Sequence, residues 1–194
     1  MKRVLNVGGN SRNIALPPIF DGWEKVLLDI DPKGNPDIVC DARELSRLPG
    51  GEYDAVYCSH NLEHYHRHEV RLVLDGFKHV LNTGGFIFVR VPDIAEVMQL
   101  AVERELDIED VLFHNGIAGD ITVQDVIYGF GAEIERSGND YFAHKTGFSC
   151  KSLTRALNTA GFAHVFLGTD ALEIHAFGFT QAPDAPTKTW LNLG

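Results

Sequence analysis

The sequence predicts an α/β fold in which helices cover both faces of a mostly parallel sheet. Short apolar runs, typical of buried strands, follow one another through the first half of the chain. A segment with apolar residues at helical spacing lies between the fourth run and the fifth. Glycine and acidic residues collect directly after the runs, where the strands of a parallel sheet end at a common edge. We therefore expect a doubly wound sheet with a ligand site at that edge.

The individual elements follow from composition and from the residues that stop them. Strands are expected at residues 4–7, 26–30, 37–40, 53–58 and 86–91. Each run ends near glycine, aspartate, serine or proline, which favour turns. A helix is expected over residues 69–81, with glycine at 84–85 as its left-handed cap. A second helix at 151–160 precedes two antiparallel strands at 163–167 and 173–179.

Residues 94–147 are expected to form a helical insertion after the fifth strand, within a single domain that spans residues 1–194. Apolar spacing predicts a helix at 94–106, and Thr122 with Asp125 resembles a capping pair that starts another. The stretch is rich in glycine and acidic residues, so it is either a substrate lid or a solvated cover for one face of the sheet. Residues 182–194 are expected to be a C-terminal tail.

Charge and composition exclude several classes of function. The chain of 194 residues carries 17 basic and 27 acidic side chains, a net charge of −10. Residues 103–140 alone hold ten acids and two arginines, a net charge of −8. Such a surface repels a phosphate backbone, so a nucleic-acid partner is not expected. The sequence has no apolar run of membrane-spanning length, so no membrane partner is expected either.

Cellular location and assembly are indicated more weakly. The three cysteines, Cys40, Cys58 and Cys150, contain no CxxC pair, which predicts reduced thiols and a cytoplasmic protein. The apolar pair Trp190 and Leu191 could dock on a second copy of the chain, which would make a homodimer.

Candidate ligand residues follow the first three strands. Gly8 stands where the backbone could approach a cofactor closely. The dinucleotide pattern GxGxxG is absent, because Asn10 stands at its second glycine position and Arg12 is no glycine either. Pro17 and Pro18 also shorten any helix that follows. These features count against NAD or FAD.

Two aspartates stand at the ends of the second and third strands. Asp29 lies 21 residues after Gly8, where a carboxylate can accept both hydroxyls of a ribose. Asp31 is better interpreted as part of a surface turn before Pro32. Asp41 could accept an adenine amino group, with Ala42 leaving room for the flat ring. An N-cap role for Asp41 is the alternative, and both roles can hold together.

In this order the segments VLNVGGN, VLLDIDP, DIVCDA, YDAVYCSHNLEH and FKHVLNTGGFIFVRVPD resemble class I S-adenosylmethionine-dependent methyltransferases. The chain is most similar to small predicted methyltransferases with an SHxLEH segment after the fourth strand, and IYG, HKTGF and LTRALNTAGF continue the resemblance. The match extends from residue 3 to about residue 180. It implies a Rossmann-like, seven-stranded sheet whose last strand is antiparallel, with S-adenosylmethionine at the strand ends.

The resemblance also implies roles for individual residues. Gly8 would contact the methionine part of the cofactor, Asp29 the ribose and Asp41 the adenine. Ser59 and His60 would form the floor near the methyl group. The whole implied cofactor set is Asn6, Gly8, Asn10, Asp29, Ile30, Asp41, Ala42, Ser59 and His60.

Four of the nine histidines, His60, His64, His66 and His68, lie within nine residues. Zinc or iron could use such a cluster together with Glu63 and Glu69. The spacing argues against it, since His64 and His68 share a face only if the segment is helical throughout. No metal ligand is therefore assigned. His60 and His64 are candidate general bases, and His144 is a third, expected beside the substrate.

The sequence thus predicts methyl transfer from S-adenosylmethionine to a small-molecule acceptor. Two alternatives stay open. One is a non-catalytic, methyltransferase-like binding module whose altered glycine motif no longer holds the donor. The other is a histidine-cluster metalloprotein on the same fold.

Overall fold

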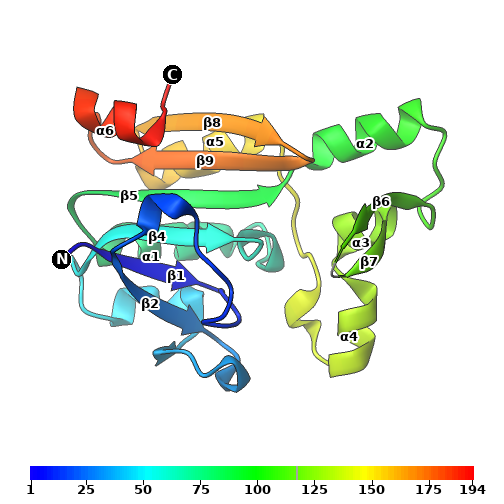
Figure 1. Cartoon of the computed structure of the whole chain (residues 1–194), viewed down its shortest axis with the longest axis horizontal. Coiled ribbons are helices and arrows are strands. Elements are labelled where there is room, and N and C mark those ends of the chain that lie inside the picture. The colour runs from blue at the N-terminus through cyan, green and yellow to red at the C-terminus, as the bar shows by residue number, and fades with distance from the viewer. Residues whose placement is uncertain (117) are drawn as a thin grey trace.

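The computed structural model describes residues 1–116 and 118–194 and is built on a seven-stranded sheet of order β3-β2-β1-β4-β5-β9-β8 (Figure 1). Adjacent strands from β3 to β5 pair in parallel, whereas β9 is antiparallel to both β5 and β8. The predicted fold class is confirmed. The strands are β1 (Arg3–Val7), β2 (Glu24–Asp29), β3 (Ile38–Val39), β4 (Tyr53–Ser59), β5 (Leu81–Pro92), β8 (His164–Asp170) and β9 (Glu173–Phe179).

One face of the sheet is covered by α1 (Val70–Val80), α5 (Cys150–Ala160) and the 3-10 helix η3 (Ala42–Arg47). These elements share the larger hydrophobic core with β1, β4 and β5. The predicted glycine cap of α1 is wrong. The helix ends at Val80, Leu81 is already extended, and Gly84 takes its positive φ of 85° inside β5, where the pairing with β4 shifts register. The chain enters β5 directly because Leu81 pairs with Tyr53 of β4.

The other face carries an aromatic layer instead of long helices. Between β1 and β2 the chain forms only the 3-10 helix η1 (Pro18–Phe20). The prediction that Pro17 and Pro18 shorten this helix is confirmed. Phe20 is fully buried and its ring lies near those of Trp23, Tyr57 and Phe86. This layer forms the second hydrophobic cluster of the domain.

The C-terminal residues also belong to this face, so the expected tail is in part a helix, α6 (Ala185–Leu191). Asp184 caps it by accepting a hydrogen bond from the Thr187 amide. Leu191 is buried in the aromatic layer, and the Trp190 ring stacks on Trp23 at 5.9 Å between centroids. Leu191 therefore packs on its own chain, whereas Trp190 stays 42% exposed, and the homodimer stays a prediction.

The segment between β5 and α5 lies beyond the arrowheads of β1, β4 and β5 in Figure 1, at the carboxyl ends of the parallel strands. It holds α2 (Ile94–Glu103), β6 (Val111–Asn115), β7 (Gly119–Thr122), α3 (Val123–Tyr128), α4 (Gly131–Ser137) and the 3-10 helix η5 (Asp140–Phe142). The capping box of Thr122 and Asp125 is confirmed at the start of α3. The antiparallel pair β6–β7 was not predicted, and the lid role of residues 94–147 stays a prediction.

This segment has a small hydrophobic cluster of its own. Val97, Leu112 and Val123 are buried together, one each from α2, β6 and α3. The cluster holds the segment beside the strand ends, where Leu172 of the β8–β9 turn packs against it. Across the described residues, no helix combines the length and the apolarity that crossing a membrane requires.

Candidate active site

A cavity of about 800 Å³ lies at the carboxyl ends of the parallel strands. On one side it is lined by residues of β1, β2, β4 and β5 and of the loops that follow β1, β2 and β4. On the other side it is lined by residues of β6, β7 and α3 and of the stretch 130–144. Nine residues that the sequence assigned to the site line this one cavity: Asn6, Gly8, Asn10, Asp29, Ile30, Ser59, His60, His64 and His144. Its position agrees with the rule that ligands bind outside the carboxyl ends of such strands.

Asp29 is fixed at the end of β2 by backbone donors. Its Oδ2 accepts from the Asn10 amide at 2.9 Å, and its Oδ1 accepts from the Asp31 amide at 2.9 Å. Asn10 adopts the left-handed conformation expected of it, with φ at 56°. An ionised carboxylate offers about four lone-pair sites, so each oxygen keeps capacity for a further donor. The side chain is thus held in place with accepting capacity left for a ligand.

The turn after β1 is packed tightly against the chain that follows β4. Gly8 has φ at 71°, and a Cβ built there would lie 2.2 Å from Nδ2 of Asn61. Gly9 is equally confined, because its Cβ would lie 2.0 Å from Nδ2 of Asn6. Only glycine fits at Gly8, since it tolerates positive φ and leaves room for the Asn61 side chain.

Arg12, the non-glycine residue of the first motif, does not belong to the site. Its guanidinium forms an ion pair with Asp37 and donates to the Asn35 carbonyl at 3.3 Å. The cavity lining, as far as the chain is described, does not include Arg12. The departure from the glycine pattern therefore leaves the donor side of the cavity open.

We expect Arg12→Ala to leave the affinity for S-adenosylhomocysteine unchanged. The free energy of unfolding should fall by about 1 kcal/mol or less, because the ion pair with Asp37 is half exposed. Calorimetric titration and urea unfolding measure the two quantities, and Arg47→Ala, which removes another exposed ion pair, is the control. A gain in affinity of about tenfold or more would show instead that Arg12 obstructs the site.

Asp41 and Ala42 lie outside the cavity lining described here. Asp41 caps η3 by accepting from the Arg43 amide at 2.9 Å, and its carboxylate also pairs with the Arg43 guanidinium. Ala42 is buried in the main core. The N-cap interpretation of Asp41 is confirmed, and the adenine-binding role of both residues stays a prediction.

His60 is held between two carboxylates. Its Nε2 lies 2.8 Å from Oε1 of Glu173, and its Nδ1 lies 3.5 Å from Oε1 of Glu63. Burial favours a lower pKa for His60, but the hydrogen bond to Glu173 and the negative charges of both glutamates outweigh burial and raise its pKa to about 10. Burial likewise raises the pKa of Glu173, but His60 and Arg90 outweigh it and lower that pKa to about 2. This pairing argues against His60 as a general base at neutral pH.

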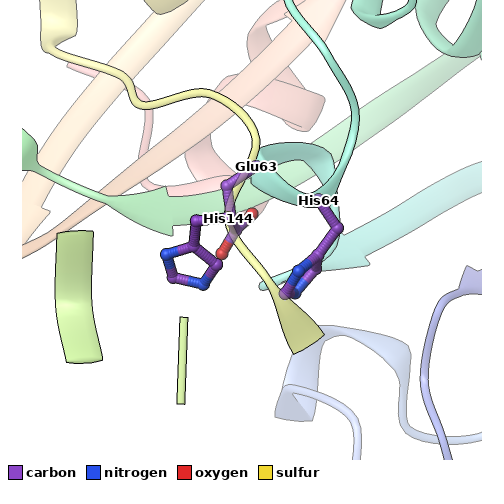
Figure 2. A group of neighbouring side chains, drawn as sticks. All are labelled: Glu63, His64 and His144. Atoms are coloured by element: carbon purple, nitrogen blue, oxygen red, sulfur yellow. The ribbon is translucent and has the colours of Figure 1, made fainter. Parts of the chain in front are cut away.

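Glu63, His64 and His144 come together although 80 positions separate His144 from His64. The amides of Lys145 and Thr146 donate to the Glu63 carbonyl at 2.8 and 3.1 Å, which draws the HKTGF segment against the 3-10 helix η4 (Leu62–His64). The rings of His64 and His144 then lie 4.9 Å apart between centroids. Figure 2 shows the Glu63 side chain beside the two imidazoles.

The other two histidines of the sequence cluster are elsewhere. Tyr65 is extended after η4, and His66 and His68 stack on each other at 5.7 Å as exposed side chains. Glu69 pairs with Arg43. The four histidines of residues 60–68 are therefore split in space, and His144 lies beside His64 where His66 and His68 do not.

Sequence reasoning missed three charged residues of the site: Glu63 as a buried carboxylate, Arg90 and Glu173. Arg90 of β5 and Glu173 of β9 form an ion pair diagonally across the strand pairing, in which Arg90 is opposite His175. Arg90 interrupts an apolar run of β5, and this charged residue was the signal that could have marked it as part of the site. Glu173 gave none, because its partners at the site, His60 and Arg90, lie more than eighty residues away.

The outer wall of the cavity is mainly apolar and aromatic. The side chains that form it on residues 113–142 are Phe113, Ile121, Val126, Phe130, Tyr141 and Phe142. Gly129 secures this wall, since a Cβ at that position would lie 2.1 Å from the Phe142 carbonyl oxygen. The tight crossing of Gly129 and Ala143 explains the glycine of the IYG motif.

Comparisons with known proteins agree with this geometry. Residues 21–89 match the family model described as a methyltransferase domain. The fold is similar to an S-adenosylmethionine-dependent methyltransferase from Archaeoglobus fulgidus, with 16% identity, a TM-score of 0.56, and coverage of 91% of this chain and 85% of that one. No sequence among the curated proteins matches the chain.

A second similar structure is 1,6-didemethyltoxoflavin-N1-methyltransferase from Burkholderia thailandensis, solved with 1,6-didemethyltoxoflavin and S-adenosylhomocysteine bound. The two sequences are 14% identical, and the structures superpose with a TM-score of 0.54. The match covers 94% of this chain and 71% of the other. Family model and fold together confirm the resemblance stated from the sequence. The chain has the class I fold of methyltransferases whose cofactor is S-adenosylmethionine.

Proposed function

We propose that this protein transfers a methyl group from S-adenosylmethionine to a small-molecule acceptor. The observation that carries the proposal is one cavity with two different halves at the carboxyl ends of the strands. Polar strand-end residues form one half, and the aromatic wall of residues 113–142 forms the other. Pockets for one drug-sized ligand measure about 300–1,000 Å³. The volume of about 800 Å³ lies in the upper part of this range.

The donor would occupy the polar half. Asp29 would accept the ribose hydroxyls with the lone pairs that the backbone donors leave free. Gly8 would let the backbone approach the methionine part closely, and Ile30, exposed at the cavity, would pack beside the nucleoside. Ser59 and His60 would lie beneath the methyl group at the end of β4.

In methyl transfer the protein mainly has to align the reacting groups, because the donor sulfonium is already reactive. Holding nucleophile, methyl carbon and sulfur in line can supply roughly 7–11 kcal/mol of the barrier. The acceptor would lie against the aromatic wall, and its reacting atom would face the histidine group His60, His64 and His144. The charge of −8 over residues 103–140 favours a neutral or cationic acceptor.

Two features support an enzyme over a binding module that has lost the donor. Arg12 turns away to Asp37 and does not fill the donor half. Asp29, Gly8 and Asn10 keep the geometry that the donor requires. The acidic stretch of residues 103–140 also favours a small molecule over a nucleic acid as the acceptor.

Calorimetric titration with S-adenosylmethionine and with S-adenosylhomocysteine tests the proposal. We expect both to bind with micromolar affinity, followed by formation of S-adenosylhomocysteine, detected by mass spectrometry, when small phenols, alcohols and amines are screened. If neither cofactor form binds a protein with a cooperative thermal transition, the proposal is wrong. Binding without turnover for any acceptor class would favour the non-catalytic module.

A further inference from the structure

The group formed by Glu63, His64 and His144 has the composition of a metal site (Figure 2). One ligand atom from each side chain can be chosen so that all three lie within 4.8 Å of one another. Two of the residues end η4, and the third follows η5, so two separate segments converge on one point. The cavity is lined by both imidazoles.

The buried carboxylate is the second observation. Glu63 is 1% exposed, and among the described residues neither of its side-chain oxygens has a hydrogen-bond partner. Its nearest cation is His60, whose Nδ1 is 3.5 Å from Oε1, beyond ordinary hydrogen-bond length. An uncompensated buried carboxylate is costly, and buried charges are normally paired or bound to a metal. Glu63 is therefore a buried charge without a hydrogen bond, whose long ion pair to His60 is shared with Glu173, at the point where two imidazoles meet.

One imidazole, that of His144, is already oriented as metal ligands usually are. It donates from Nδ1 to the Val126 carbonyl at 2.9 Å, which leaves the lone pair of Nε2 available. The His64 ring nitrogens each lie 3.1 Å from a carbonyl oxygen, that of Ala143 for Nδ1 and that of His60 for Nε2. A metal ion would displace one of these carbonyl contacts of His64, and the other contact would hold the ring. Metal-bound histidines typically make such a bond to a carbonyl with their second nitrogen.

We propose that Glu63, His64 and His144 bind one divalent transition-metal ion, with its open positions facing the acceptor half of the cavity. Two imidazoles and one carboxylate suit zinc, cobalt, iron(II) or manganese better than magnesium or calcium, which prefer oxygen ligands. Bonds of about 2.0–2.2 Å would bring the ligand atoms to roughly 3–4 Å from one another. The three ligand atoms would therefore need to move roughly an ångström closer to one another.

This inference rests on the proposed function and names its acceptor class. A metal ion lowers the pKa of a bound hydroxyl, so the acceptor would be an alcohol, a phenol or an enol. The hydroxyl proton leaves to solvent, and the acceptor oxygen forms a bond to the methyl carbon as the carbon–sulfur bond breaks. The electron pair of that bond goes to sulfur, and neutral S-adenosylhomocysteine departs.

The test is titration of chelator-treated protein with Zn²⁺ by calorimetry and with Co²⁺ by visible absorption. We expect one ion per chain and a d–d absorption band from Co²⁺ that Zn²⁺ abolishes and Mg²⁺ does not. Glu63→Gln and His144→Asn should each weaken Zn²⁺ binding by roughly 100-fold or more, since loss of even an outer partner costs 10–100-fold. His68→Ala, which removes an exposed histidine of the neighbouring turn, should bind like the wild type.

Binding of S-adenosylhomocysteine to the same metal-free proteins separates the possible failures. If the wild type binds S-adenosylhomocysteine but takes up neither Zn²⁺ nor Co²⁺, the metal site is overturned and the proposed function stands. Equal Zn²⁺ affinity in His144→Asn, Glu63→Gln and the wild type also overturns the metal site. Variants that keep their S-adenosylhomocysteine affinity and thermal midpoint are folded, so a loss of metal binding in them supports the site.

Discussion

Replacing Asp29 with alanine is expected to weaken the binding of S-adenosylhomocysteine by about 100-fold or more. Hydrogen bonds to a charged group contribute about 1.5–3 kcal/mol each, so two lost ribose contacts amount to at least about 3 kcal/mol. The substitution also removes the acceptor for the Asn10 and Asp31 amides, which hold the two turns beside the cavity. Calorimetric titration measures the change directly.

Asp31→Ala is the matched control. Asp31 is also an acidic residue at the cavity, but its carboxylate accepts from the Lys33 amide and caps a 3-10 turn. We expect the affinity of Asp31→Ala for S-adenosylhomocysteine to change by less than about fivefold. Asp29→Asn should fall between the two, because it keeps an oxygen for one backbone donor. Wild-type affinity in Asp29→Ala would remove Asp29 from the donor site.

Gly8→Ala is expected to abolish measurable binding of S-adenosylhomocysteine and to lower the free energy of unfolding by about 2–4 kcal/mol. A left-handed conformation costs a non-glycine residue about 1–2 kcal/mol. The added methyl group would also meet the Asn61 side chain at 2.2 Å and force it out of place. Displacement of Asn61 disturbs the floor of the cavity at the end of β4.

Gly51→Ala isolates the backbone contribution. Gly51 has φ at 73°, close to that of Gly8, but its Cβ would have no neighbour within 4 Å among the described residues. Urea unfolding should show a loss of about 1 kcal/mol, with the affinity for S-adenosylhomocysteine unchanged. If Gly8→Ala behaved like Gly51→Ala, the contact with Asn61 would not matter for the site.

The strands of the main sheet and the helices packed against it could be predicted because local patterns determine them. Apolar runs stopped by turn residues marked every strand of the main sheet, and the Thr122–Asp125 pair marked the start of α3. The hairpin β6–β7 was not predicted. Its two strands are short and mostly exposed, so their sequences lack a clear alternation of apolar and polar residues.

The histidine group shows why the site itself was only partly predictable. Closeness in sequence suggested His66 and His68, but the chain turns at Tyr65 and takes both away from His64. His144 joins instead, through amide hydrogen bonds from residues 145 and 146 to Glu63. Such long-range pairing leaves no periodicity in the sequence. The position of Arg12 could not be predicted for a related reason, since its partner Asp37 lies beyond the next strand.

The separate hydrophobic cluster of residues 94–147 has a consequence for how this protein could diversify. Val97, Leu112 and Val123 stabilise the aromatic wall largely without the core beneath the sheet. Substitutions in Phe113, Phe130 or Tyr141 can therefore change the shape of the acceptor half while the donor half keeps its architecture. A lineage of such chains can acquire new acceptors through one stretch of sequence, and a laboratory library confined to that stretch would sample specificity at little risk to folding.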